Sequence, residues 1–145
     1  MIETIKFSCV LDTLDSTCPL GMEIWLDDQQ IFNENHVSSQ IIFEHELSDT
    51  DGEHELKFVM KGKTSEHTKV DATGQILHDA RLILRDLRFD EIELGHMFTE
   101  LATYTHDLNG TGPTTQNKFY NELGCNGTVS LKFTTPIYLW LLENM

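Results

Sequence analysis

Apolar and polar residues alternate strictly in short segments along most of this chain. The first of these segments spans residues 5–11, and the same period returns over 22–27, 37–47, 53–61 and 128–134. A period of two places successive side chains on opposite faces of a β-strand. Gly, Asn and Asp residues between the segments are typical of tight turns. The pattern predicts a β-sandwich or barrel, and we expect a single domain over residues 1–145 with an antiparallel, jelly-roll-like sandwich of about eight strands.

Residues 80–89 fit either a helical stripe or a strand, and we favour the strand. Its inward positions are then 82 and 84, followed by 87 and 89 after a one-residue shift near Arg85–Asp86, which predicts a β-bulge. A further strand is expected within 98–106. Within the 18 residues from Gly62 to Asp79, the segment Val70–Ile76 predicts a small hairpin that protrudes from the body. Insertions of this length are usually functional or mobile.

The C-terminal segment is apolar on every face. It fits a strand, or a two-turn helix that Thr135 caps and that carries Pro136 at its first position. Such a segment must be covered on all sides, either by its own core or by a neighbouring subunit of an assembled particle. The residues expected to bind the partner are Ile137, Tyr138, Leu139, Trp140, Leu141 and Leu142.

The charge balance narrows the choice of partners. Twenty-four acidic residues stand against ten basic ones, and the formal net charge is -14. Binding to a phosphate backbone requires Lys and Arg, so nucleic acid and anionic membranes are not expected as partners. The N-terminus lacks the apolar core of a signal peptide, which predicts synthesis in a cytoplasm. The three cysteines have no metal-binding spacing and are expected to be buried free thiols.

The chain carries no pattern that is typical of an enzyme. Its seven histidines form no HExxH motif or zinc-finger spacing, and no nucleophile elbow or phosphate-binding loop is present. Glutamates at 44, 46, 53 and 55 fall on outward positions of adjacent strands, where we expect them to be solvated. A polysaccharide-cleaving enzyme would need two carboxylates at a fixed separation, which a sequence does not supply. We therefore expect a protein that is not an enzyme.

Two ligand hypotheses rest on particular residues. Asp71, Asp79 and Asp90 lie in or beside the 62–79 insertion, where carboxylates would converge on a calcium ion. No other cofactor is expected. Trp25 points away from the core of its strand, which makes it a candidate platform for stacking a sugar ring.

The chain resembles two kinds of known proteins. Gly52–Met60, together with Asp79–Leu84 and Phe89–Leu94, resembles the paired strands of calcium-dependent, xylan-type carbohydrate-binding modules. This likeness implies a glycan partner. It also implies a calcium-binding role, and Asp79 is the one residue to which that role is assigned. The wider combination of segments, which includes Tyr104–Gly110 and Gly124–Met145, resembles small uncharacterised proteins of tailed phages that infect cyanobacteria. That likeness covers most of the chain and implies a component of a virion.

Two functions of different class follow. The first is a structural protein of a phage particle, present in many copies, that docks onto other virion proteins through its C-terminal segment and loops. Its expected location is the virion, after synthesis in the host cytoplasm. The alternative is a carbohydrate-binding module that attaches to a host surface, with calcium as its one candidate ion.

Overall fold

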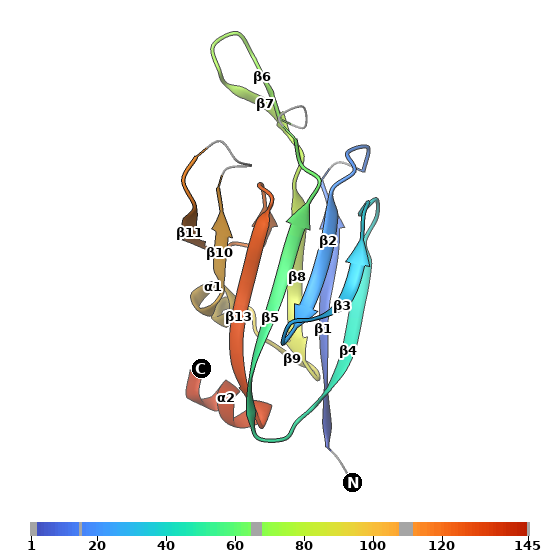
Figure 1. Cartoon of the computed structure of the whole chain (residues 1–145), viewed down its shortest axis with the longest axis vertical. Coiled ribbons are helices and arrows are strands. Elements are labelled where there is room, and N and C mark those ends of the chain that lie inside the picture. The colour runs from blue at the N-terminus through green and yellow to red at the C-terminus, as the bar shows by residue number, and fades with distance from the viewer. Residues whose placement is uncertain (1–2, 15, 65–67, 108–111, 145) are drawn as a thin grey trace.

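Two antiparallel β-sheets pack face to face and form a sandwich (Figure 1). The computed structural model describes residues 3–14, 16–64, 68–107 and 112–144, without the side chains of 68–69 and 76–79. One sheet has the order β12-β8-β1-β4, with β9 beside β8, and the other has the order β11-β10-β13-β5-β2-β3. Both sheets have open edges. The predicted sandwich is confirmed, and the barrel is excluded.

The elements have the following bounds. The first sheet contains β1 (Thr4–Thr13), β4 (Ile41–Ser48), β8 (Leu82–Phe89), β9 (Ile92–Glu93) and β12 (Glu122–Leu123). The second contains β2 (Gly21–Leu26), β3 (Gln29–Glu34), β5 (Gly52–Lys61), β10 (Thr103–His106), β11 (Thr115–Lys118) and β13 (Gly127–Thr135). A separate hairpin consists of β6 (Thr68–Val70) and β7 (Ile76–Asp79), and the two helices are α1 (His96–Leu101) and α2 (Ile137–Asn144). Neither described helix is long and apolar enough to cross a membrane.

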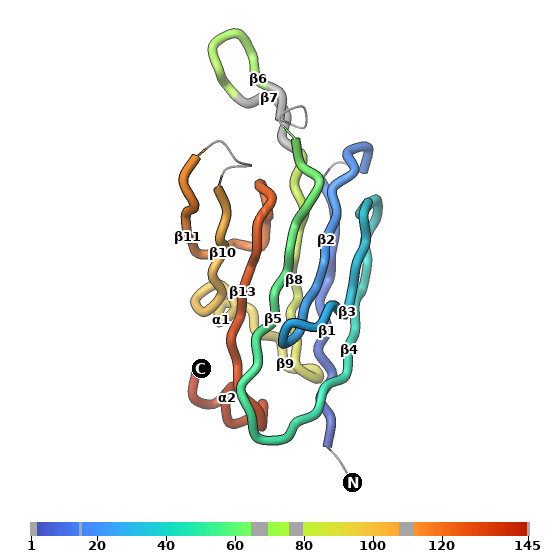
Figure 2. The backbone as a smooth tube through the Cα atoms, viewed as in Figure 1, coloured from blue at the N-terminus to red at the C-terminus, as the bar shows by residue number. Residues whose placement is uncertain are grey.

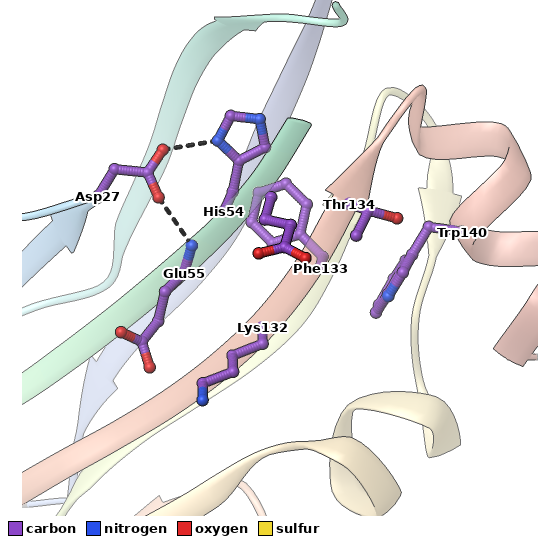
Figure 3. Close-up of a pocket in the computed structure, with 8 residues that line it drawn as sticks. Asp27, His54, Glu55, Lys132, Phe133, Thr134 and Trp140 are labelled. Atoms are coloured by element: carbon purple, nitrogen blue, oxygen red, sulfur yellow. Dashed lines mark hydrogen bonds and ion pairs between the residues drawn. The ribbon is translucent and has the colours of Figure 1, made fainter. Parts of the chain in front are cut away.

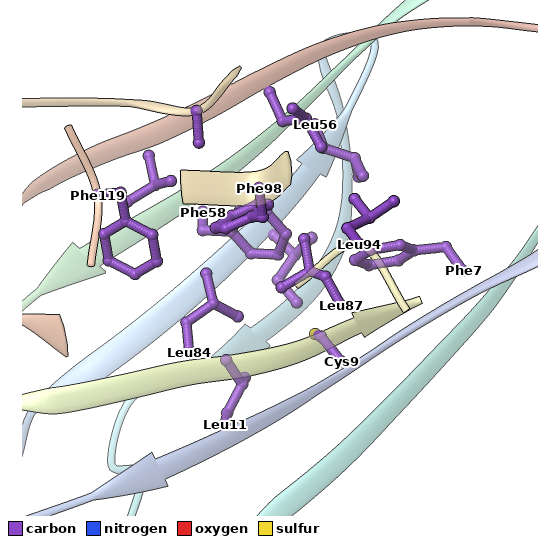
Figure 4. Packing of buried hydrophobic residues seen from close by; sticks show 14 of the residues in the cluster. Phe7, Cys9, Leu11, Leu56, Phe58, Leu84, Leu87, Leu94, Phe98 and Phe119 are labelled. Atoms are coloured by element: carbon purple, nitrogen blue, oxygen red, sulfur yellow. The ribbon is translucent and has the colours of Figure 1, made fainter. Parts of the chain in front are cut away.

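The alternating segments supply the core as the period predicts. The side chains of β1 and β8 that face the opposite sheet are buried, and so are those of β5 and β13. Aromatic rings from both sheets meet at the centre, where the ring centroid of Phe7 lies 6.0 Å from that of Phe58 (Figure 4). The centroid of Phe89 lies 5.7 Å from that of Phe7. Buried Cys9 packs among them, and burial raises the pKa of its thiol to about 12. Cys18 and Cys125 are half-buried, and all three are free thiols.

The predicted β-bulge lies in β8. Ser8 of β1 pairs with Arg88, and Val10 pairs with Arg85, so two residues of β8 face one residue of β1. Asp86 absorbs the extra residue with a backbone φ of 55°. Because the inserted residue changes the face of every later side chain, Leu87 points into the core.

The long insertion forms the predicted hairpin. Its strands β6 and β7 project from the end of the sandwich opposite to α2 (Figures 1 and 2). At the tip, the Asp71 carboxylate accepts hydrogen bonds from the backbone N–H groups of Thr73 and Gln75, each at 2.9 Å. The residue therefore stabilises a turn of its own hairpin.

Three local predictions were wrong. The strand expected over 98–106 is a helix as far as Leu101 and a strand from Thr103, because Phe98 enters the core from a helical turn. The strand expected over 37–47 begins at Ile41. Residues 29–34, for which no strand was predicted, form the edge strand β3. The two sheets contain eleven described strands where about eight were expected.

The apolar C-terminal segment is a helix, and it covers the part of the β13 edge that has no neighbouring strand. β10 pairs with β13 only as far as Ser130, so the later part of β13 has no strand on that side. α1 and α2 pack there instead (Figure 1). The Thr135 side chain does not cap α2 as expected. Asp49 takes that role, because its carboxylate accepts a hydrogen bond from the N–H of Ile137 at 2.8 Å.

Candidate functional site

A pocket of about 500 Å³ lies beside the joined strands β5 and β13 (Figure 3). The turn after β2 bounds one side and α2 bounds the other. Its lining residues are Asp27, Glu53, His54, Glu55, Lys132, Phe133, Thr134 and Trp140. The polar groups come from outward side chains of the two strands, from His54 and from Asp27 of the turn, and the apolar wall consists of Phe133 and Trp140, which are 2% and 6% exposed. Its volume lies within the range of about 300–1,000 Å³ that is typical of small-molecule sites.

A hydrogen-bonded brace fixes one wall of this pocket. Asp27 Oδ2 lies 2.6 Å from His54 Nδ1, and Asp27 Oδ1 accepts the N–H of Glu55 at 2.8 Å (Figure 3). On its other side, His54 Nε2 lies 3.0 Å from Thr135 Oγ1. The Thr135 hydroxyl donates in turn to the carbonyl oxygen of Thr50. The brace therefore ties together the β2–β3 turn, the β4–β5 loop and the end of β13.

The order of Asp27, His54 and Thr135 resembles that of a nucleophilic triad. The arrangement does not fit that chemistry. Thr135 is only 2% exposed, and its hydroxyl proton is already donated to a backbone carbonyl. A nucleophile must reach the substrate and pass its proton to the histidine. The three residues hold the wall of the pocket in place.

Glu55 is also fully engaged. Its carboxylate accepts a hydrogen bond from the Ser130 hydroxyl at 2.5 Å and lies 3.5 Å from the ammonium group of Lys57. Lys57 reaches Asp28 at 3.7 Å as well. Lys132 lies directly opposite Glu55 in the register of β5 and β13, yet Glu55 is occupied by these other partners.

Lys132 and Glu53 are left without partners. Neither side chain forms an ion pair or hydrogen bond with any residue that the structure describes, and both are exposed. The other described basic side chains are all engaged: Lys6, Lys57, Lys61, Arg81, Arg85, Arg88 and Lys118 with carboxylates, and Lys63 with a backbone carbonyl. Diagonal positions on paired strands are about 7–8 Å apart. The pocket thus presents one uncommitted cation and one uncommitted anion, a short distance apart.

The predicted sugar platform Trp25 lies on the same outer sheet face but does not line the pocket. Its indole Nε1–H donates to Glu23 Oε1 at 2.9 Å, and Gln30 donates to the same oxygen at 3.0 Å. The bond from Trp25 and the nearby ammonium of Lys61 hold the pKa of Glu23 below its usual value. Trp25 pairs across the sheet with Lys57, which contacts Glu55 of the pocket. Side chains on the outer face of this sheet therefore connect Trp25 with the pocket through Lys57 and Glu55.

Two of the three aspartates predicted to bind calcium, Asp71 and Asp90, lie far apart. The Asp71 carboxylate is used within the hairpin turn, whereas Asp90 follows β8 directly, and the turn from β8 to β9 lies at the other end of the sandwich from the hairpin (Figure 1). Asp90 accepts hydrogen bonds from the N–H of Lys6 at 2.9 Å and the hydroxyl of Tyr138 at 2.7 Å. The side chain of Asp79 lies outside the described residues. Among those that are described, no group of three or more His, Cys, Asp or Glu side chains is placed to hold a metal ion.

The structure divides the predicted partner-binding segment into two faces. Ile137, Trp140 and Leu141 are buried in the core of their own chain, so these three are not exposed to a partner. Tyr138, Leu139 and Leu142 remain 48%, 59% and 71% exposed. Trp140 also lines the pocket, which the sequence did not indicate. Lys132 carries no sequence signal of its own, because its lack of a partner follows from contacts between distant residues.

Comparisons with known proteins bear on the fold. No protein-family model matches the sequence, and no curated protein matches it. The structure is similar to "vCBM60 in complex with galactobiose", with a TM-score of 0.47 and 9% identity over 87% of this chain and 96% of the other. It is also similar to a SeMet form of vCBM60 from work on two families of calcium-dependent carbohydrate binding modules, with a TM-score of 0.50 and 10% identity over 88% and 89%. The structural neighbours are carbohydrate-binding modules, and at such low identity the likeness concerns the fold.

Proposed function

We propose that this chain is a non-catalytic carbohydrate-binding module and that it binds a neutral sugar in the pocket between β5 and α2. The observation that carries the proposal is the uncommitted pair Lys132 and Glu53 beside an apolar wall. A sugar offers hydroxyl groups that both donate and accept hydrogen bonds, together with apolar C–H surface. Glu53 accepts and Lys132 donates, and the C–H surface of the sugar lies against the part of Trp140 that is open to the pocket, which is 6% of the residue.

Charge favours a neutral ligand over an acidic one. Three carboxylates line the pocket, and the whole chain has a formal charge of -14. An anionic sugar would approach against this field. The fold shared with carbohydrate-binding modules supports the proposal by analogy, and the pocket chemistry supports it independently.

Isothermal titration against a panel of neutral oligosaccharides, galactobiose and xylan fragments included, tests the proposal. We expect Lys132→Gln and Glu53→Gln each to weaken binding about tenfold or more, since a hydrogen bond to a charged group contributes about 1.5–3 kcal/mol. The matched control is Lys118→Gln, because Lys118 pairs with Glu100 away from the pocket. All three variants should keep their unfolding free energy within about 0.5 kcal/mol. Absence of binding to the whole panel, or binding that ignores both pocket variants, would contradict the proposal.

Calcium is tested in the same titration. The similar modules are described as calcium-dependent, but Asp71 and Asp90 lie apart and are engaged elsewhere. The proposed sugar contacts all come from protein side chains. We therefore expect a chelator to change the affinity less than about twofold, which is below 0.5 kcal/mol. A larger loss would show that an ion takes part in binding.

We also propose, as a second function, that the chain docks onto other proteins of a virion. The exposed face of α2 favours this role, because Leu139 and Leu142 present apolar surface to solvent at 59% and 71% exposure. Mass spectrometry of purified phage particles should find the chain as a multi-copy component. The double variant Leu139→Lys, Leu142→Lys should fold normally and be lost from the particles. A chain that is absent from particles, or a variant that is retained, would contradict this role.

A further inference from the structure

A second pocket adjoins the first along the same face of the molecule. Its volume is about 330 Å³, and it lies where α1 and α2 approach the start of β10 and the middle of β13. The lining residues are Leu101, Thr103, Ser130, Lys132, Trp140 and Asn144. Lys132 and Trp140 line both pockets, so the two cavities share a boundary formed by these two side chains.

The chemistry of the second pocket suits another neutral sugar unit. Thr103 and Ser130 bring hydroxyl groups, and Leu101 contributes an apolar surface that is 38% exposed. Asn144 is fixed at the end of α2, because its side-chain nitrogen donates to the carbonyl oxygen of Trp140 at 2.8 Å. Lys132 is the one ionisable group of this lining. A unit bound there meets hydroxyls, an amide and an apolar contact, and none of the described lining residues carries a carboxylate.

Lys132 stands at the boundary of the two cavities. An ammonium group has three donors, so a lysine without a protein partner is able to contact ligand groups on both sides. Each cavity by itself reaches the volume of a small-molecule site. A ligand that fills both is therefore longer than the occupant of either one.

We propose that the two pockets form one groove and that the ligand is a neutral oligosaccharide of at least two sugar units, bound across Lys132. This inference rests on the proposed function and specifies its ligand class. The first pocket holds one unit against Glu53 and the Asp27–His54 wall. The second pocket holds the next unit against Thr103 and Leu101.

A length series tests the groove. The neutral sugar that binds best in the panel is titrated as monosaccharide, disaccharide and trisaccharide. We expect the disaccharide or trisaccharide to bind at least about tenfold more tightly than the monosaccharide, a difference of about 1.4 kcal/mol. Thr103→Val and Leu101→Ala should reduce this gain to about twofold or less while leaving the affinity of the monosaccharide unchanged.

Tyr120→Ala serves as the control, since Tyr120 is 68% exposed and lines neither pocket. This variant should preserve the full length dependence. Equal affinity of monosaccharide and trisaccharide would overturn the groove and leave the single-site function intact. Equal weakening of short and long ligands by the second-pocket variants would also overturn it. Failure of every sugar to bind would instead contradict the proposed function itself.

Discussion

Replacement of Trp140 by alanine tests whether α2 belongs to the core of its own chain. Trp140 is 6% exposed, and its ring lies 6.2 Å from Phe89 and 6.1 Å from Phe133 between centroids, in edge-to-face contacts. Truncation of a buried tryptophan or phenylalanine costs about 3–5 kcal/mol. Each aromatic pair adds about 0.5–1.5 kcal/mol to burial alone. We therefore expect Trp140→Ala to lower the unfolding free energy by about 4 kcal/mol.

Urea unfolding followed by far-ultraviolet circular dichroism measures this loss. The matched control on the same helix is Leu142→Ala, because Leu142 is 71% exposed and its truncation should cost less than about 0.5 kcal/mol. The unfolding free energies of small domains are about 5–15 kcal/mol. Trp140→Ala should therefore retain a measurable unfolding transition or be marginally folded. Trp140→Phe keeps an aromatic ring in place and should lose less. A cost below about 1 kcal/mol for Trp140→Ala, or an equal cost for both alanine variants, would refute the packing described for α2.

Two further predictions concern acid stability and close backbone packing. The pKa of Glu23 is lowered in the folded protein, so its ionised form stabilises the fold above the pKa of an unfolded glutamate, and this contribution is lost as pH falls through the folded value. The destabilisation caused by Glu23→Gln at pH 7 should therefore shrink as unfolding is measured at progressively more acidic pH, and a constant difference would contradict the pKa shift. A Cβ atom on Gly127 would overlap the facing backbone of β10, so Gly127→Ala should lower the unfolding free energy by about 1–3 kcal/mol. The matched Gly52→Ala meets no neighbouring atom closer than 3.8 Å and should cost clearly less in the same thermal and urea scans, whereas equal costs would refute the close approach.

Alternation alone predicted the sandwich and many of the side chains that face its core. The period of two is a local property, because each side chain of a strand points to the face opposite its neighbour. The break in that period at Asp86 was enough to predict the bulge, and the Asp71 turn marked the hairpin. The helix at 96–101 was missed because six residues are too few to show a helical period. The edge strand 29–34 was missed because an edge strand that is open to solvent shows no clear alternation.

The candidate site depended on the tertiary structure far more than the fold did. The sequence placed Glu53 and Lys132 correctly on outward positions, but it gave no reason to single them out. Their availability arises because Ser130 and Lys57 occupy Glu55, the residue that faces Lys132 across the paired strands. Such competition among partners on two paired strands has no signature in a single sequence.

The apolar C-terminal segment shows the same division. The sequence determined that residues 137–142 need cover on every side, because no polar side chain interrupts them. Only the tertiary structure decided which of these residues are covered. Trp140 packs against aromatic rings of β8 and β13, while Leu142 remains exposed to solvent. Hydrophobic periodicity is read from neighbours along the chain, whereas burial and free hydrogen-bonding capacity depend on which distant segments meet in space.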